Sequence, residues 1–494
     1  MKKRMLCTIE LLGIFSLLFP QTPPDTLWTK NFGGSNDDGA YSLQQTFDGG
    51  YIITGATESF GAGSNDVYLI KTNEHGDSVW TKAYGGARDD EGYSVQQTSD
   101  SGYIVVGSTY SFGASYEDDA WLIKTDPNGD TIWTKRYGET NHSDRGYSVQ
   151  QTDEGGYIIT GSTESYGLNL AHAWLIKTDS SGNMLWDKTF GGADTVSYGC
   201  FVRQTNDGGY ILTGWKDHSG TGDYDVWLIK TDSSGNKLWD KLWGRGYYDY
   251  GRCVQQTIDG GYIVTGETRP YGATNSDVWL IRTDANGDTA WTKTYGGIAD
   301  DRGWSVQQTS GGGYILTGYT ASYGAGGGDA WLIKTDSSGN KIWDRTFGGS
   351  AYDYSRSVRQ TKDDGYIIAG ETSSYGSGGK DVYLIRLASE VGVYDHPLQA
   401  LCKNYDLYQN YPNPFDAQTT ISFSIPKAGR INISIYNIIG QNIKTLADGK
   451  LSIGHHQVIW NGKDENDMPV SSGIYFYKME TADFSVLRKC ILLK

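Results

Sequence analysis

One segment recurs seven times along this chain, and it constrains the fold more than any other feature of the sequence. Three markers, W-[TD]-[KR], [VL]-[QR]-Q-T and an aromatic residue followed by Leu-Ile, each recur with a period of 52 to 54 residues. Periods near 50 residues are typical of propellers and of linear repeat arrays. The Trp residues of the first marker are Trp28, Trp80, Trp133, Trp186, Trp239, Trp291 and Trp343.

Each unit contains four short segments rich in Val, Ile, Thr, Tyr and Trp, bounded by Gly, Asp and Asn. This pattern is typical of antiparallel strands joined by tight turns, and no segment shows a sustained helical period. Four short strands per unit correspond to one propeller blade.

The array starts on a fourth strand, at 26–32, and ends on a third strand, at 382–387. Pairing these two segments would complete the last blade, close the ring and remove its open sheet edges. An open solenoid would have no need to begin on a fourth strand and end on a third. The sequence therefore predicts an all-β fold with a closed seven-bladed β-propeller over 25–388.

Composition excludes several other classes of protein. The 67 Gly residues follow no three-residue period, which excludes collagen, and 13% aromatic residues are too many for a disordered chain. A net charge of −16 argues against nucleic acid as a partner. No apolar run reaches the roughly 18 residues of a membrane helix, so we expect no integral membrane protein, and we expect a monomer.

The first 22 residues form a separate segment. Lys2, Lys3 and Arg4 precede a mostly apolar stretch over 11–19, a pattern that predicts a secretory signal peptide over 1–22. The alternative is a short N-terminal helix of the mature protein.

The repeat unit resembles the PQQ-type and kelch-type propeller repeats. The segment WLIKTDSSGNKLWDK at 227–241 shows the features shared with the PQQ-type repeat, an apolar strand, an Asp, a Gly turn and then a Trp. The resemblance covers the whole array and implies the fold alone.

The last ninety or so residues differ from the repeats. After a predicted linker over 389–405, alternating residues such as Ile431, Ile433 and Ile435 predict a small β-sandwich over 406–494. This segment resembles the C-terminal sorting domain of the type IX secretion system and the related FlgD-like immunoglobulin-type fold. The resemblance implies recognition by the type IX secretion machinery, and release or attachment at the cell surface. The matching sorting-signal residues are Asn410, Tyr411, Pro412, Asn413, Pro414, Phe415, Gly473, Tyr475 and Lys494.

Motifs for catalysis or metal binding are not found. The chain has no H-x-x-x-H or C-x-x-C pattern, no G-x-S-x-G elbow and no P-loop, so we name no catalytic residue and expect no cofactor. Two Asp series recur, one before each first strand and one opening each third strand. They predict carboxylates that accept backbone N–H bonds in loops or, alternatively, a ring that binds Ca²⁺. The members are Asp38, Asp90, Asp144, Asp249, Asp301 and Asp353, and Asp66, Asp119, Asp225, Asp277, Asp329 and Asp381.

A specific site usually breaks the symmetry of a repeat array, and this array breaks it in its third to fifth units. His172 replaces an Asp there, and the neighbouring loops differ from their equivalents. Divergence without function is the alternative. The candidate binding residues are His172, Asp194, Trp215, Lys216, Asp217, His218, Arg245, Tyr247 and Tyr248.

A second set of candidates follows an S-[FY]-G or similar pattern in the long loops. These aromatic rings either stack on sugars or fold down onto their own blades. They are Phe60, Phe112, Tyr166, Tyr271, Tyr323 and Tyr375.

These observations predict a secreted or surface-displayed propeller that binds a glycan or protein ligand without catalysis. The alternatives are an extracellular polysaccharide lyase or hydrolase and a purely structural surface protein. Cys200 and Cys253 lie on neighbouring first strands, where they form either a disulfide or two free thiols.

Overall fold

The computed structural model describes residues 22–493 except 114–116, 166–169, 193, 218–221, 245, 271, 391–404, 409, 411–412, 414, 417, 428, 452–453 and 482–483. The chain forms two compact units, which divide between Val391 and Gly392. The signal peptide and most of the linker lie outside the described residues, so the proposed domain boundaries stay predictions. Within the described part the regular elements are strands, and no helix long and apolar enough to cross a membrane occurs there.

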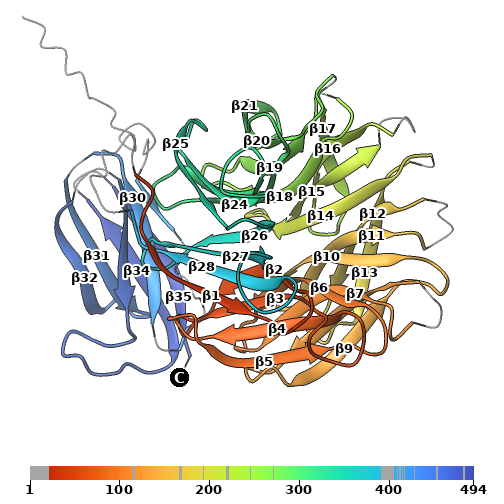
Figure 1. Ribbon diagram of the computed structural model, residues 1–494. Coiled ribbons are helices and arrows are strands. Elements are labelled where there is room, and N and C mark those ends of the chain that lie inside the picture. The colour runs from red at the N-terminus through yellow and green to blue at the C-terminus, as the bar shows by residue number, and fades with distance from the viewer. Residues whose placement is uncertain are drawn as a thin grey trace, which may run out of the picture. The chain divides into compact units, whose positions relative to one another are not determined.

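Seven four-stranded antiparallel sheets form the first unit, and we number them as blades 1 to 7 (Figure 1). In blades 1 to 6 the chain crosses the sheet strand by strand. The first strands are β2 (Asp38–Gln45), β6 (Asp90–Gln97), β10 (Asp144–Gln151), β14 (Ser197–Gln204), β18 (Tyr250–Gln256), β22 (Asp301–Gln308) and β26 (Asp353–Gln360). The second strands are β3 (Tyr51–Thr57), β7 (Tyr103–Thr109), β11 (Tyr157–Thr163), β15 (Tyr210–Asp217), β19 (Tyr262–Thr268), β23 (Tyr314–Thr320) and β27 (Tyr366–Thr372).

The outer half of each blade completes the sheet. The third strands are β4 (Asp66–Thr72), β8 (Asp119–Thr125), β12 (His172–Thr178), β16 (Tyr224–Thr231), β20 (Asp277–Thr283), β24 (Asp329–Thr335) and β28 (Asp381–Leu387). The fourth strands are β5 (Ser78–Tyr84), β9 (Thr131–Tyr137), β13 (Met184–Phe190), β17 (Lys237–Trp243), β21 (Thr289–Tyr295), β25 (Lys341–Phe347) and, in blade 7, β1 (Thr26–Phe32).

The ring is closed by the first segment of the array. Strand β1 pairs antiparallel with β28, with Phe32 opposite Val382 and Thr26 opposite Leu387. First strands of neighbouring blades contact each other all the way round, including β26 with β2, so they are the innermost strands and line the central channel. The predicted closed seven-bladed propeller is confirmed.

Aromatic packing joins each blade to the next. Trp28 of blade 7 meets Tyr51 of blade 1 edge to face, with ring centroids 6.0 Å apart. The same pairing recurs at every interface with centroid distances between 5.8 and 6.1 Å. The remaining pairs are Trp80–Tyr103, Trp133–Tyr157, Trp186–Tyr210, Trp239–Tyr262, Trp291–Tyr314 and Trp343–Tyr366.

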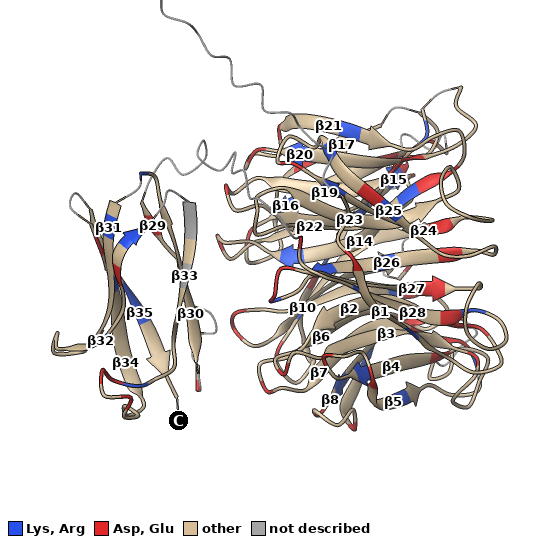
Figure 2. Ribbon diagram, turned by 60° about the vertical axis from the view of Figure 1, so that its left-hand side comes forward, with Lys and Arg blue, Asp and Glu red and all other residues tan. Residues whose placement is uncertain are grey.

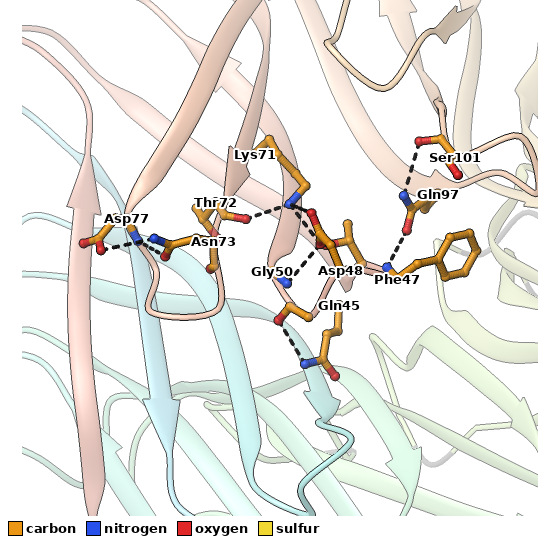
Figure 3. Close-up of polar contacts among 12 residues, drawn as sticks. Gln45, Phe47, Asp48, Gly50, Lys71, Thr72, Asn73, Asp77, Gln97 and Ser101 are labelled. Carbon is orange, nitrogen blue, oxygen red and sulfur yellow. Dashed lines mark hydrogen bonds and ion pairs between the residues drawn. The ribbon is translucent and has the colours of Figure 1, made fainter. Parts of the chain in front are cut away.

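The second Gln of the Q-Q-T marker also joins neighbouring blades. In Figure 3 the side-chain oxygen of Gln97 in blade 2 accepts the backbone N–H of Phe47 in blade 1, at 2.8 Å. The equivalent bond recurs at all seven interfaces and ends with the Lys362 N–H of blade 7 on Gln45 of blade 1, at 3.0 Å. The second Gln residues therefore form a belt of hydrogen bonds around the ring. The sequence pattern alone did not reveal this role.

A buried cation holds the tight turn between the first two strands. Lys71 Nζ lies 2.8 Å from Asp48 and also donates to the Thr72 carbonyl (Figure 3). Equivalent ion pairs occur in five other blades. Blade 6 is the exception, because Gly311 stands where the others have Asp or Glu, and Lys334 donates to Thr309 Oγ1 and the Thr335 carbonyl.

We expect Gly311→Asp to stabilise the propeller by about 1 kcal/mol, because it supplies the missing carboxylate to Lys334. Burial lowers the pKa of Lys334, and a Cβ at Gly311 would meet no atom within 4 Å. Urea unfolding monitored by Trp fluorescence would measure the gain. Gly311→Asn is the uncharged control, and an equal gain from Asn would contradict the ion-pair explanation.

These ion pairs also predict a loss of stability in acid. Burial opposes ionisation of Asp207, but hydrogen bonds from Thr205 and Lys230 outweigh it and lower its pKa to about 2. The pKa values of Asp48, Asp100, Asp259 and Asp363 are also lowered. Because the folded-state values are depressed, this stabilisation is complete above about pH 4 and is lost as the pH falls towards 2. The urea midpoint should fall over that window, and less so in Asp207→Asn; a flat midpoint would contradict the prediction.

The second unit is a small β-sandwich, as predicted. One sheet has the order β29-β30-β33 and the other β32-β31-β34-β35. Alternating residues of β31, among them Ile431, Ile433 and Ile435, are buried in the core together with Trp460 and Tyr477. The strands are β29 (Asp406–Leu407), β30 (Thr419–Ile425), β31 (Gly429–Asn437), β32 (Asn442–Leu451), β33 (Gly454–Trp460), β34 (Gly473–Glu480) and β35 (Ser485–Leu492).

Candidate functional site

A β-bulge interrupts the first strand of every blade at the same position. In blade 1 the pairing with β3 shifts between Ala40 and Ser42, so Tyr41 is the extra residue. Because the first strands line the channel, these bulges place seven residues around it. They are Tyr41, Tyr93, Tyr147, Cys200, Arg252, Trp304 and Arg356. The backbone repeats, whereas these side chains do not, so the bulges give the symmetric ring an asymmetric lining.

Aromatic rings at the bulges contact one another around part of the channel. Tyr41 and Tyr93 stack with centroids 5.7 Å apart, and Tyr93 lies 5.3 Å from Tyr147. Across the closure, the Arg356 guanidinium lies 4.4 Å from the Trp304 ring centroid and 5.5 Å from that of Tyr41. We call these five residues the aromatic collar. Burial raises the pKa of Tyr41, Tyr93 and Tyr147, so their hydroxyl groups are neutral at physiological pH.

The predicted residue Trp215, on β15, belongs to a larger aromatic cluster that continues the collar. Its ring stacks on Tyr198 at 4.4 Å and lies 4.6 Å from Tyr224 and 5.5 Å from Tyr250. Tyr248 lies 5.6 Å from Tyr224. We call these five residues the Trp215 cluster. Tyr147 connects it to the collar, since its ring lies 6.4 Å from that of Tyr198.

The structure thus brings together the aromatic half of the predicted site. Tyr248, predicted from its loop, is in the cluster, and Tyr247 is next to it with ring centroids 6.5 Å apart. Both side chains are substantially exposed. Tyr198, Tyr224 and Tyr250 were missed because each occupies a variable position in a strand, and only the folded sheet shows that these positions adjoin.

The charged half of the predicted site is not drawn into this cluster. Lys216 lies over the Trp227 ring at 5.2 Å, and buried Asp217 accepts the N–H of Gly222 at 3.1 Å. His172 is buried, its Nε2 has no hydrogen-bond partner among the described residues, and burial lowers its pKa. Asp194 lies in the exposed loop before β14. His218 and Arg245 lie outside the described residues, and the binding role of all nine candidates stays a prediction.

Two buried carboxylates beside the collar are neutralised by paired cations. Glu267 lies 2.7 Å from Arg252 and 3.2 Å from Arg302. Glu371 lies 3.2 Å from Arg356 and 3.3 Å from Lys380. These ion pairs hold the bulge arginines in position.

A polar pocket of about 250 Å³ adjoins the collar between blades 1 and 3. Tyr93 donates a hydrogen bond from its hydroxyl to Glu91, and Arg145 donates to Tyr110 at 3.2 Å. The pocket shares Tyr93 with the collar, and the sequence analysis missed it because its residues come from three blades. Its lining residues are Asn65, Asp89, Glu91, Tyr93, Ser108, Tyr110 and Arg145.

Most residues of the two Asp series accept loop backbone N–H groups, as the first of the two alternatives predicted, whereas Asp119 pairs with Arg136 at 2.8 Å. Asp38 accepts the N–H of Gly34 at 2.8 Å, and Asp66 accepts that of Ala62 at 2.7 Å. Figure 2 shows acidic residues at the strand ends and in the loops of the propeller. The described residues contain no group of three or more His, Cys, Asp or Glu able to hold a metal ion. Binding of Ca²⁺ stays a prediction.

The described S-[FY]-G rings fold down onto their own blades, as one alternative predicted, and stay partly exposed, while stacking on sugars stays a prediction. Phe112 packs on the buried ring of Trp121 at 5.2 Å, yet 45% of its surface is exposed. Phe60, Tyr323 and Tyr375 pack in the same manner on the third strands of their own blades. Tyr166 and Tyr271 lie outside the described residues.

The disulfide alternative is wrong for Cys200 and Cys253, which are both free thiols. Cys200 is the extra residue of its bulge, whereas Cys253 follows the bulge of the next blade, so the two are out of register. Cys490 is a buried free thiol of the second unit, and Cys402 lies outside the described residues.

The sorting motif of the second unit is anchored to its last strands. The Asn410 backbone N–H donates to the Tyr477 hydroxyl at 2.8 Å, and Asn413 Oδ1 accepts the N–H of Ile491 at 2.8 Å. Phe415 packs edge to face on Trp460 at 5.4 Å. Tyr475, near the start of β34, lies 5.0 Å from Trp460 and donates to the Ser471 carbonyl at 2.8 Å. Tyr411, Pro412, Pro414 and Lys494 lie outside the described residues.

A protein family matches the segment that contains this motif. Residues 409–493 match the secretion system C-terminal sorting domain family. The sorting domain implies export by the type IX secretion machinery and a secreted or cell-surface location. The propeller lies outside the matched segment.

Solved structures resemble this chain at low sequence identity. PorZ, described as an essential surface component of the type IX secretion system of Porphyromonas gingivalis, is 13% identical with a TM-score of 0.43; the match covers 94% of this chain and 60% of PorZ. A fungal alcohol oxidase in complex with copper is 11% identical with a TM-score of 0.45, covering 96% of this chain and 100% of the oxidase. The β-propeller domain of the Trilobed protease from Pyrococcus furiosus is 8% identical with a TM-score of 0.40. The match covers 76% of this chain and 98% of that domain. No curated protein matches this sequence.

Proposed function

We propose that the propeller is a glycan-binding module that its sorting domain delivers to the outside of the cell. The observation that carries this proposal is the continuous run of aromatic rings from Tyr41 to Tyr248, beside a polar pocket of about 250 Å³. Aromatic faces stack on the apolar faces of sugars, while nearby polar groups bind their hydroxyls. An extended row of rings suits a chain of sugars better than a single small molecule.

A glycan array probed with the full mature chain would test the proposal. We expect a bound oligosaccharide whose affinity falls at least about tenfold in Trp215→Ala/Tyr248→Ala, the loss of about 1.4 kcal/mol that one lost stacking contact represents. Phe47→Ala is the control, since it removes a half-exposed ring from the tight turn between β2 and β3 of blade 1, outside both clusters. Circular dichroism would confirm folding of each variant.

The outcomes separate this function from its competitors. Unchanged affinity in the double variant would exclude the Trp215 cluster as the binding surface. A protein captured at the collar with no array signal would favour a protein ligand, and no ligand of either kind would favour a purely structural surface protein.

A polysaccharide-active enzyme is the second candidate, favoured by the acidic residues of the pocket. Asp89 and Glu91 line it together with Tyr93 and Arg145, and acid–base catalysis on glycans uses such groups. Asp89 accepts two hydrogen bonds from Asn65, at 3.2 and 3.3 Å, whereas Glu91 accepts one from the Tyr93 hydroxyl, so Glu91 is the carboxylate to test. Release of sugar products by the wild-type chain, abolished by Glu91→Gln while binding persists, would establish this alternative.

A further inference from the structure

Deeper in the channel, the first Gln of the Q-Q-T marker forms a second ring of side chains. In five blades its side-chain oxygen accepts a backbone N–H of the next blade, at 2.6 to 2.8 Å. The oxygen is therefore occupied, and the amide nitrogen remains a donor without an acceptor among the described residues. The five residues are Gln44, Gln96, Gln150, Gln255 and Gln307.

Serines that lie two residues before this position in the first strands also accept hydrogen bonds from the next blade. Ser42 Oγ accepts the N–H of Val95 at 3.4 Å, and Ser94 Oγ accepts that of Val149 at 3.3 Å. Ser148, Ser305 and Ser357 accept equivalent N–H groups at 3.3 to 3.4 Å. With their acceptors engaged by the next blade, these hydroxyls also remain donors. Two successive levels of the channel wall are thus rich in hydrogen-bond donors.

Two blades break the glutamine ring, and both place an arginine there. Arg203 of blade 4 and Arg359 of blade 7 occupy the Gln position. Their Nη1 atoms donate to the carbonyls of Val202 and Val358, at 2.8 and 2.7 Å. Neither guanidinium forms an ion pair with any carboxylate of the described residues, although the whole chain carries a net charge of −16.

The two arginines act on each other across the channel. Burial and then the charge of Arg359 lower the pKa of Arg203 to about 10, and burial lowers the pKa of Arg359. The buried Cys253 thiol of blade 5 lies within reach of both charges and donates to the Val306 carbonyl at 3.7 Å. Two like charges in a donor-rich channel repel each other, and an anion bound between them would relieve that repulsion.

We infer that this level of the channel binds a small inorganic anion, held by the guanidinium groups of Arg203 and Arg359 and by the glutamine amides. Guanidinium and amide N–H groups are the donors that proteins use for halides and for tetrahedral oxyanions. The site is separate from the aromatic collar and does not depend on the proposed glycan binding.

Crystals of the full chain soaked in sodium bromide, and others soaked in sodium sulfate, would test the inference. We expect an anomalous bromide peak, or sulfate density, within hydrogen-bond distance of both guanidinium groups. Arg203→Gln/Arg359→Gln is the matched variant, because five blades already carry Gln there and folding should be unaffected. A peak that persists unchanged in this variant would show an adventitious ion only and would overturn the inference.

Thermal unfolding supplies a second readout in solution. In gluconate buffer, whose anion is much larger than chloride or sulfate, the double Gln variant should unfold at a higher temperature than the wild type. Chloride or sulfate should raise the melting temperature of the wild type by about 2–4 °C and leave that of the variant unchanged. Equal shifts in both proteins, or no shift in either, would contradict the inference.

Discussion

Alanine in place of Gly161 should destabilise the propeller by about 3 kcal/mol or more, because no side chain fits at this position. A Cβ on Gly161 would lie 1.7 Å from the carbonyl oxygen of Arg145, a backbone atom that cannot move aside. The bulge of the first strand brings this carbonyl over the glycine of the second strand. Urea unfolding of the purified chain would measure the loss.

Gly311→Ala is the control for this variant. It also adds a methyl group at a glycine, but one whose Cβ would meet nothing within 4 Å. A urea midpoint for Gly161→Ala close to that of Gly311→Ala would contradict the explanation. The same clash exists in every blade, with distances of 1.7 to 1.9 Å at Gly55, Gly107, Gly161, Gly214, Gly266, Gly318 and Gly370.

Truncation of Trp343 to alanine is expected to cost about 3–5 kcal/mol of stability, because it leaves a cavity between blades 6 and 7. The side chain is 3% exposed, packs on Tyr366, and donates from its indole N–H to Glu390 at 3.2 Å. Trp343→Phe keeps a ring in the interface and should lose less.

Leu238→Ala serves as the surface control, since this residue of β17 is 58% exposed and should change the urea midpoint little. A loss below about 1 kcal/mol for Trp343→Ala would show that the repeated Trp residues are not the main packing between blades.

Much of the propeller could be predicted from its period alone. Seven copies of one unit fix the number of blades, and the spare strand at 26–32 predicts closure with the strand at 382–387, which the β1–β28 pairing confirms. The period also locates the Trp residues of the fourth strands, and the structure shows that their side chains pack between neighbouring blades.

The candidate site was predicted only in part. Trp215 and Tyr248 were found because their loops differ from the equivalent loops in length and composition. Their partners Tyr198, Tyr224 and Tyr250 lie in regular strands, where one changed side chain gives no signal in a single sequence. The pocket around Glu91 was missed for the same reason, since its residues are far apart along the chain.

The sequence by itself determined the all-β architecture, the seven blades and the sorting domain, because each depends on local pattern repeated at a fixed spacing. Only the tertiary structure decided which variable side chains face one another. The physical reason is the β-bulge: it adds one residue to each first strand, turns that side chain towards the channel, and sets a carbonyl against the glycine of the next strand. Tyr41, Trp304 and Arg356 are far apart in the chain, and ring closure places them in contact.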